Sequence, residues 1–412
     1  MNPNSLRNSA LLSLFAFLLV GSASAAAQAG QLDSTFGSGG IASKSTTVTR
    51  TSNSYFVGAV AMQSDGKIVV AGGIPGNNDF TVPAVIRLNP DGSRDSSFGK
   101  NGVVVLAGAF GGYGALAIQS DGKILVTTNA QSSANGEIDR YTTTGHLDSS
   151  FGNKGSVVFE LTGLSGVALQ ADGRILISLQ PLANSMFEVT RLNTDGTTDM
   201  SFGTNGLALP PGGNGALTVL SNGEILVFGG LISRLTSSGA IDASFGVNGQ
   251  LLASTAGQVV AGNGDILTAG TLVIEPAVPS SGLAAFAYQS VGIGDPAFGS
   301  NGGVLAAIPN FPRVSATGLG LESTGAIVEL GTVSTATSGA FGLVRYTAQG
   351  QLDASFGSGG TVTTSFGTNT TPIASAITIQ VDDKIIAAGT VTSPALHGEF
   401  NTSLVVARYL AK

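Results

Sequence analysis

The sequence predicts an all-β protein, a seven-bladed β-propeller of four-stranded blades, and three observations support this prediction. The first is a motif, Gly-x-x-Asp-x-x-Phe-Gly-x-x-Gly, which recurs seven times along the chain. The second is its spacing: successive motif aspartates lie 43 to 62 residues apart, too far for a helical hairpin repeat but suitable for a propeller blade. The third is a series of short apolar runs bounded by turn residues. The motif aspartates are Asp33, Asp95, Asp148, Asp199, Asp242, Asp295 and Asp353.

The apolar runs predict four strands in each repeat and almost no helix. One interval contains runs at 59–62, 68–71, 85–88 and 103–106. With 10% charged residues and 60 glycines, the composition alone would also fit a disordered linker. The regular strand pattern argues against that alternative.

Two kinds of hairpin turn recur. An Asp-Gly or Asn-Gly pair separates the first two strands of most repeats, as at Asp65-Gly66, and predicts a two-residue loop with positive φ. Thr324-Gly325 and Asp382-Asp383 are weaker versions of this pair. The glycine three residues before each motif aspartate predicts a left-handed residue in the turn between the third and fourth strands.

An arginine lies eight positions before five of the motif aspartates, at Arg87, Arg140, Arg191, Arg234 and Arg345. In the predicted hairpin the two residues are cross-strand neighbours. The motif aspartates could be seven acidic ligand sites, but the repetition of the motif in every blade favours a structural Arg–Asp pair. The repeated Phe is likewise interpreted as packing between blades.

The fifth repeat departs from this pattern. Ala287 replaces the arginine, and Pro296 and Ala297 follow the motif aspartate Asp295. We expect either a distorted blade or an Asp295 that is free for another role.

The two ends of the repeat region fit together. The C-terminal sequence Arg408-Tyr409-Leu410-Ala411-Lys412 followed by Gly30-Gln31-Leu32-Asp33 reproduces the repeat without a gap. We therefore expect residues 30–412 to form one domain, closed by pairing of the N- and C-terminal strands. The strand after Gly40 should complete the last blade and cover its edge.

Residues 1–29 are interpreted as a signal peptide. Arg7 precedes an apolar run from Leu11 to Val20 and a tract of small residues, with a cleavage site after Ala27-Gln28-Ala29. The run is too short to span a bilayer and lacks the amphipathic spacing of a buried helix, the alternative weighed here. With no cysteine for a lipid anchor, we expect a secreted or periplasmic protein without membrane insertion.

Charge argues against nucleic acid as a partner. The chain has 18 basic and 25 acidic residues, and loss of Arg7 with the signal peptide leaves a net charge of −8. Whether the ligand is a protein or a polysaccharide is left open, and we expect a monomer.

The repeat resembles a known family. Arg345 to Gly360 contains Arg-Tyr and Gly-x-Leu-Asp-x-Ser-Phe-Gly-x-x-Gly, and Ala117 to Ile124 reads Ala-Ile-Gln-x-Asp-Gly-Lys-Ile. These segments resemble the delta-60 repeat family of exported bacterial β-propeller proteins, over essentially all of residues 30–412. The resemblance implies fold and export, and it supplies no functional residue.

Residues typical of catalysis are scarce. The two histidines, His146 and His397, belong to opposite faces of the predicted propeller, and there is no Cys or Trp. No catalytic, metal-binding or cofactor-binding residue is assigned, and no cofactor is expected. If a ligand site exists, we expect it on the loops between second and third strands, because these vary in length and sequence. They contain Asp79, Glu137, Glu275, His397 and Glu399.

Two functions fit these observations. The first is a secreted binding or structural scaffold. The alternative is an exported hydrolase or lyase that uses carboxylates and a divalent metal on the loop face. Convergence of three or more of the acidic side chains would favour the enzyme, and scattered carboxylates would favour the scaffold.

Overall fold

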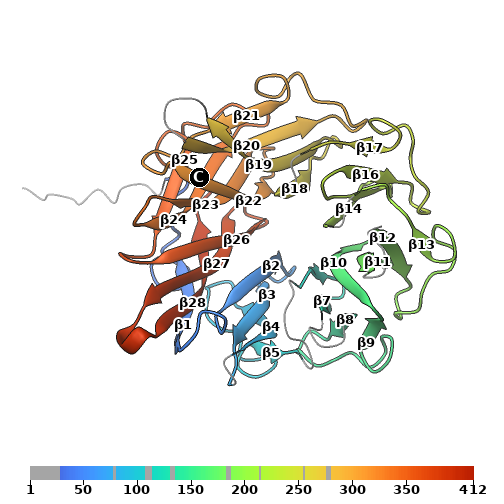
Figure 1. The fold of residues 1–412 in the computed structure, drawn as a ribbon, viewed down its shortest axis with the longest axis horizontal. Helices are drawn as coiled ribbons and strands as arrows, with labels where there is room; N and C mark the ends of the chain where they lie inside the picture. Colours follow the sequence, from blue (N-terminus) through green and yellow to red (C-terminus); the bar gives the residue numbers. More distant parts are fainter. Residues whose placement is uncertain are drawn as a thin grey trace, which may run out of the picture.

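The computed structural model describes residues 28–77, 80–106, 114–129, 135–181, 187–212, 215–253, 256–274 and 280–412. Across these residues, seven four-stranded antiparallel sheets form a ring around a central axis (Figure 1). The all-β, seven-bladed architecture predicted from the motif spacing is confirmed. The described residues contain one short helical element, the 3-10 turn η1 (Leu396–Gly398).

Blades one to six run outward from the axis in chain order, and blade seven takes its outermost strand from the N-terminal end of the described chain. Blades one to four contain β2 (Phe56–Met62), β3 (Ile68–Pro75), β4 (Thr81–Leu88), β5 (Val103–Val105); β6 (Leu116–Ile118), β7 (Ile124–Asn129), β8 (Gly136–Tyr141), β9 (Ser156–Phe159); β10 (Thr162–Leu169), β11 (Ile175–Pro181), β12 (Glu188–Leu192), β13 (Leu207–Ala208); and β14 (Leu217–Val219), β15 (Ile225–Val227), β16 (Ile232–Leu235), β17 (Gln250–Leu251). Blades five to seven contain β18 (Gly257–Val260), β19 (Ile266–Ile274), β20 (Ser280–Tyr288), β21 (Gly303–Ala306); β22 (Arg313–Leu321), β23 (Ile327–Ser334), β24 (Gly339–Tyr346), β25 (Thr361–Ser365); and β26 (Thr371–Ile379), β27 (Ile385–Pro394), β28 (Phe400–Tyr409), β1 (Ile41–Val48).

Blade seven joins the two ends of the described chain. β1 pairs antiparallel with β28, from Ile41 opposite Ala407 to Val48 opposite Phe400, and Figure 1 shows the blue N-terminal strand beside the red C-terminal one. The backbone amide of Asp33 donates to the carbonyl of Arg408 at 2.8 Å. The predicted closure is therefore confirmed: β1 covers the edge of β28 and gives blade seven four strands, as in the other blades.

The turns between third and fourth strands have the predicted glycine geometry. Gly92, for example, has a φ of +84°, and a Cβ built there would lie 2.9 Å from a ring carbon of Phe36 in the neighbouring blade. The turns between first and second strands differ from the prediction. At Asp65-Gly66 only the glycine has positive φ, and the amide of Gln63 donates to the carbonyl of Lys67 across a three-residue loop. A three-residue loop of this kind needs one left-handed residue, whereas the predicted two-residue loop needs two.

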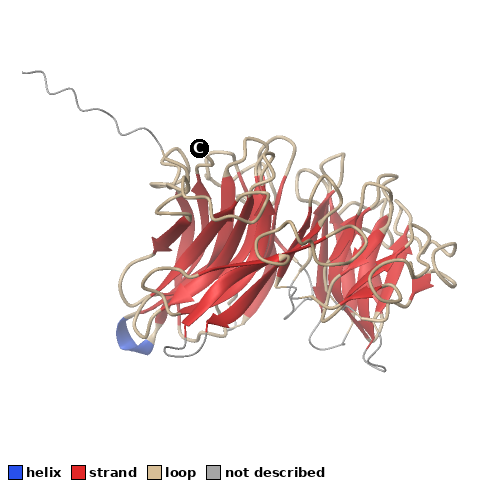
Figure 2. Ribbon diagram, turned by 90° about the horizontal axis from the view of Figure 1, so that it is seen from above, coloured by secondary structure: helices blue, strands red, loops and turns tan. Residues whose placement is uncertain are grey.

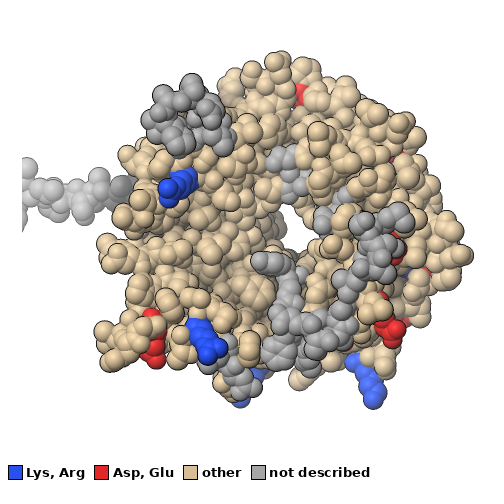
Figure 3. Space-filling view, viewed as in Figure 1, with Lys and Arg blue, Asp and Glu red and all other residues tan. Residues whose placement is uncertain are grey.

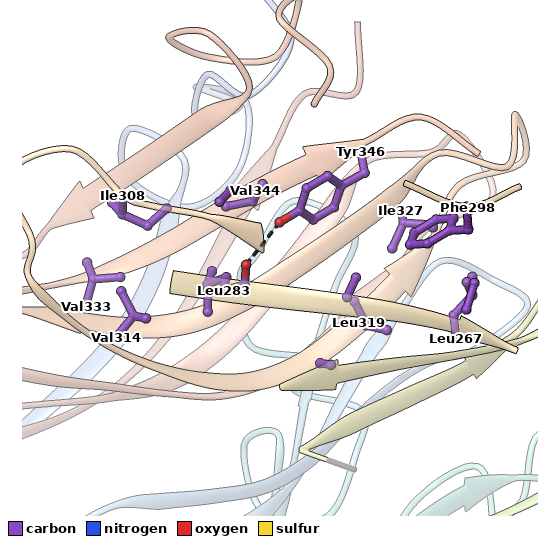
Figure 4. Close-up of a cluster of buried hydrophobic side chains, with 14 of the residues drawn as sticks. Leu267, Leu283, Phe298, Ile308, Val314, Leu319, Ile327, Val333, Val344 and Tyr346 are labelled. Carbon is purple, nitrogen blue, oxygen red and sulfur yellow. Dashed lines mark hydrogen bonds between the residues drawn. The ribbon is translucent and has the colours of Figure 1, made fainter. Parts of the chain in front are cut away.

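The core consists of apolar layers between neighbouring blades. Between blades five and six, Leu267, Leu283 and Phe298 pack against Val314 and Tyr346, and all are buried. Figure 4 shows this layer, in which the Tyr346 hydroxyl donates to the Leu283 carbonyl at 3.1 Å. The motif phenylalanines are 0–2% exposed, which confirms that they pack between blades.

Loops gather at the two ends of the sheets, and η1 lies among those at one end (Figure 2). One face therefore carries the two hairpin turns of every blade, and the other carries the second-to-third strand loops. Within the described ranges, no helix has the length and apolar character needed to cross a bilayer.

Candidate functional site

The most regular polar feature is a cluster built on an arginine in six of the seven blades. Each guanidinium forms an ion pair with the motif aspartate of its own blade at 2.6–2.9 Å. It also lies over the motif phenylalanine, 4.4–4.8 Å from the ring centroid. A third bond reaches a backbone carbonyl in the hairpin turn of the next blade. The arginines are Arg87, Arg140, Arg191, Arg234, Arg345 and Arg408.

The electrostatics of these clusters keep the aspartates ionised. A hydrogen bond from the Ser201 hydroxyl, helped by the Arg191 guanidinium, lowers the pKa of Asp199 to about 2. For Asp95, burial would raise the pKa, but bonds from Ser97 and the charge of Arg87 outweigh it, so the pKa of this carboxyl is lowered. Both carboxylate oxygens of Asp95 and of Asp199 already accept hydrogen bonds, which is the geometry of a structural clamp.

Blade five lacks this clamp, yet its backbone is undistorted. The Ala287 amide donates to Gly302 at 2.9 Å and its carbonyl accepts the Asp295 amide at 2.9 Å, as Arg87 does with Gly102 and Asp95. Of the two outcomes expected from the sequence, distortion of the blade is wrong. Within the described residues Asp295 has no basic partner, since its carboxylate accepts the amide of Ala297 alone.

The structure does not bring together the three predicted loop-face residues that it describes. Glu137 lies within β8 of blade two, whereas His397 and Glu399 lie in or beside η1 of blade seven, and blade one separates these two blades. His397 is exposed and has a φ of 58°. Asp79 and Glu275 lie outside the described residues.

Sequence reasoning missed a second acidic residue beside Glu137. Asp139 is 5% exposed and accepts hydrogen bonds from the Tyr141 hydroxyl at 2.9 Å and the Ser156 hydroxyl at 2.5 Å. Burial raises the pKa of Asp139, and burial together with the neighbouring Asp139 charge raises the pKa of Glu137. The signal was available, because acids two residues apart share one face of a strand.

A second buried carboxyl, Glu329, lies on β23 between blades five and six. It is fully buried, and neither carboxyl oxygen has a well-formed hydrogen bond. Burial raises the pKa of Glu329 well above its usual value, and the nearby backbone amides of Ala284 and Gly270 offset this only in part. A charged residue inside the apolar run Ile327–Leu330 was the sequence signal. The residue is sealed inside the core.

The central channel contains a cavity of about 840 Å³. The inner strands line it mainly with glycine, alanine and other uncharged residues, such as Gly58, Ala59, Gly215, Gly257 and Gly318. Figure 3 shows the opening, and the charged side chains visible on that face lie away from it. Its described lining residues therefore offer hydrogen-bonding backbone groups and small side chains, with no titratable group.

The family comparison identifies the kind of repeat. A domain of unknown function (DUF5122) described as a β-propeller matches residues 63–98, 119–151, 170–202 and 323–356. Each matched segment runs from the first hairpin turn of a blade to its motif phenylalanine. The chain is a β-propeller repeat protein. The matched blades are one, two, three and six, all of which carry the arginine clamp.

Solved structures with distant likeness include several propellers. A catalytically inactive virginiamycin B lyase from Staphylococcus aureus is 13% identical, with 88% of this chain and 99% of that chain covered and a TM-score of 0.47. The Dos1 propeller is 10% identical over 88% and 94%, with a TM-score of 0.42. An aldose sugar dehydrogenase from Streptomyces coelicolor is 12% identical over 71% and 93%, with a TM-score of 0.38. Likeness at this level carries no argument about activity. No curated protein matches the chain.

Proposed function

We propose that this propeller is an exported binding or structural scaffold of the delta-60 repeat type, whose partner is a protein or a polysaccharide. The observation that carries the proposal is the uncharged channel of about 840 Å³. Glycine and alanine bring backbone groups to the channel wall, where they can bind hydroxyl or amide groups of a neutral partner. The rigid ring around it provides a preorganised surface.

The distribution of titratable groups supports a scaffold more than an enzyme. General acid–base catalysis needs groups within hydrogen-bond reach of one bound substrate. Glu137 lies in blade two, and His397 and Glu399 lie in blade seven. In the part of the chain that the structure describes, no group of three or more His, Asp or Glu side chains could hold a metal ion.

One observation favours the alternative of an exported hydrolase or lyase. Glu137 and Asp139 are neighbouring carboxyl groups with raised pKa values, a property of many catalytic acids. Against this, Asp139 is already bonded to Tyr141 and Ser156, which suits a structural tie between β8 and β9. Hydrolysis or lyase activity on a polysaccharide panel that Glu137→Gln abolishes would favour the enzyme.

Export is part of the proposal and rests on residues 1–29. Intact-mass measurement of the protein recovered from a native envelope or medium fraction gives the mature terminus, which we place at Gly30. In the full chain the Gly357 amide donates to the Ala29 carbonyl, the position that Asp91 occupies toward Gly37 in the next turn. If Ala29 is removed with the signal peptide, the repeat register places Lys412 at the position from which the Ala29 carbonyl accepts the Gly357 amide.

Binding is tested by retention of envelope proteins and purified polysaccharides on the immobilised protein. Gly230 lines the channel with open space around it and no positive φ, so Gly230→Trp should narrow the channel without strain. The matched control is Gly262→Ala, at an equally open position on the hairpin-turn face. We expect the wild type and the control to retain the same partner and Gly230→Trp to lose it. Equal retention by all three proteins, or by none, would overturn the channel as the binding surface.

A further inference from the structure

Blade five contains a cavity of about 270 Å³ at the place where the other six blades hold an arginine. It opens among the hairpin turns, on the face opposite the second-to-third strand loops. Its lining includes Ala261, Ala287, Asp295 and Phe298 of blade five, and Glu322 and Ala348 of blade six. These lining residues determine which ligand the cavity could bind.

Blade six shows how the same set of partners binds an arginine; the six blades that contain this arginine are called filled. The Arg345 guanidinium pairs with Asp353 at 2.8 Å, lies 4.7 Å from the Phe356 ring centroid and donates to the Ala411 carbonyl at 2.6 Å. The accepting carbonyl lies two residues before the turn glycine of the next blade, as at Thr143 and Ser237, and Ala411 takes the equivalent place at the seam of the ring. For blade five that residue is Ala348, two before Gly350. The three partners of the missing guanidinium are therefore Asp295, Phe298 and the Ala348 carbonyl.

The turn that carries Ala348 keeps its position. The Gly299 amide donates to the Gln349 carbonyl at 2.9 Å, the bond that Gly37 makes with Asp91 in the first turn of the ring. Gly350 packs against Phe298 as Gly92 packs against Phe36. The partners are consequently held where the filled blades hold theirs.

The chain itself does not fill the gap. Ala287 replaces the arginine, Ala261 replaces the glutamine that bonds the arginine in blades one and three, and Ala297 replaces the motif serine. All three substitutions shorten side chains that point toward the cluster elsewhere. No described basic residue pairs with Asp295, and no described guanidinium lies over Phe298.

The charge of the cavity favours a cation. In four blades the residue after the first turn is a lysine or arginine that pairs with the motif aspartate, at 3.2–4.0 Å. In blade five this position is Asp265, which also lines the cavity. Glu322 adds a third carboxyl at its rim, although Arg345 holds it at 3.3 Å. Within the described residues, Asp265 and Asp295 thus line the cavity without a basic partner, and their carboxylates accept hydrogen bonds from Asn263 and from the Ala297 amide.

The depth of the cavity favours a flat cation with apolar faces. Between blades two and three, the corresponding groove is lined by polar turn residues and by Arg140. In blade five the lining continues to Leu267, Ile327 and Phe298, which Figure 4 shows together at one end of the core. A guanidinium is planar, binds carboxylates by two parallel bonds and stacks on aromatic rings, whereas an ammonium is a strongly hydrated point charge.

We propose that the blade-five cavity is a binding site for a guanidinium group, carried either by a small guanidino compound or by an arginine side chain of a peptide. The site takes the place of the missing side chain: two N–H groups meet Asp295, a third meets the Ala348 carbonyl, and the plane lies on Phe298. This inference goes beyond the scaffold function and does not rest on it. The cavity is slightly smaller than the ~300–1,000 Å³ of drug-sized pockets, so a headgroup fits and a large ligand must project into solvent.

The test is calorimetric and NMR titration of the full folded protein with methylguanidinium and agmatine, with butylammonium at equal ionic strength as the comparison. We expect one site, at which both guanidino probes bind at least ~10-fold more tightly than butylammonium. Ala287→Arg should abolish binding because it supplies the guanidinium in the chain, and Asp295→Asn should weaken it by at least ~10-fold. Lys100→Ala, at an exposed position in the motif of blade one and outside the cavity, should bind as the wild type does.

A second variant checks the site independently of blade five. Arg234→Ala removes the guanidinium of blade four and should give methylguanidinium a second site, so the stoichiometry rises from one to two. The peptide Gly-Arg-Gly distinguishes the two sources: binding as tight as agmatine supports recognition of peptide arginine, and much weaker binding supports a small guanidino compound. Absence of guanidino binding, binding unaffected by Ala287→Arg, or no preference over butylammonium would overturn the proposal.

Discussion

Blade five and the six clamped blades have the same backbone and different polar clusters, and the comparison separates two roles of the arginine. The hairpin bonds around Ala287 match those around Arg87, so the arginine is not needed to form the hairpin. What blade five lacks is the bond from the guanidinium to the next turn. The clamp therefore acts mainly between blades. At the junction of blades five and six, the apolar layer and other hydrogen bonds, such as Gly299 to Gln349, Tyr346 to Leu283 and Val314 to Ser281, connect the two sheets.

Among single substitutions, the largest expected effect comes from removing a clamp arginine. Arg345→Ala would leave Asp353 and the buried Glu322 without their cation, and loss of one member of a buried ion pair costs about 3–5 kcal/mol. Urea denaturation should show a corresponding fall in the midpoint. Lys100→Ala, an exposed position in the motif of blade one, is the control and should have little effect. A loss as small as that of the control would mean that the clamp contributes nothing to stability.

The turn glycines should come next. Gly92→Val forces a β-branched residue to a φ of +84°, a cost of at least about 1–2 kcal/mol, and pushes its Cβ against Phe36 of the preceding blade. Gly196→Val should behave alike, since Gly196 has a φ of +90° and meets Phe151. Thermal unfolding measures both. Gly294→Ala, in open space without positive φ, serves as the control, and unchanged unfolding of both valine variants would contradict the turn geometry.

Acid sensitivity should follow the clamped aspartates. The pKa of Asp199 is lowered from 3.8 to about 2, so the ionised clamp stabilises the fold above pH 3.8 and this contribution is lost as pH falls through 2. Asp199→Asn should be less stable at pH 7 and lose less between pH 4 and 2 than the wild type. Thermal midpoints measured across that range test this. Ser201→Ala should give part of the same change, because the Ser201 hydroxyl makes the largest contribution to lowering the pKa of Asp199.

Restoring the missing arginine should give a smaller, favourable effect. Ala287→Arg adds an ion pair to Asp295 and a cation–π contact with Phe298, which contributes about 0.5–2 kcal/mol. We expect the thermal midpoint to rise for this variant and to show no rise when Ala287→Arg is combined with Asp295→Ala. A lowered midpoint for the single variant would show that the cavity cannot accommodate the side chain.

The smallest effect is expected at the ring seam. Arg408 pairs with Asp33 at 2.9 Å, so the seam has the same clamp as a continuous hairpin. A circular permutant with Lys412 joined to Gly30 and new ends near Asn77 should keep the wild-type stability within about 0.5 kcal/mol. Deletion of 30–43 should instead be severely destabilising, because it removes Asp33 and part of β1 from blade seven. A stable, monomeric deletion variant would contradict the closure.

The repeated features could be predicted from the sequence because each follows from the repeat pattern itself. The motif spacing gave the blade number, the eight-residue offset gave the pairing of Arg87 with Asp95, and the matching ends gave the pairing of Arg408 with Asp33. The third partner of each arginine could not be predicted, because the carbonyl of Thr143 comes from another blade, 56 residues away. For the same reason the sequence showed that Ala287 breaks the pattern, but it could not show that Ala261 and Asp265 face the same gap.

Blade five keeps the partners of the clamp arginine without the arginine itself, and a crystal structure of the Ala287→Arg variant tests this most directly. The account predicts that the introduced guanidinium lies over the Phe298 ring, pairs with Asp295 and donates to the Ala348 carbonyl, with the fifth sheet unchanged. A side chain that extends into solvent, or a fifth sheet displaced to admit it, would contradict the account.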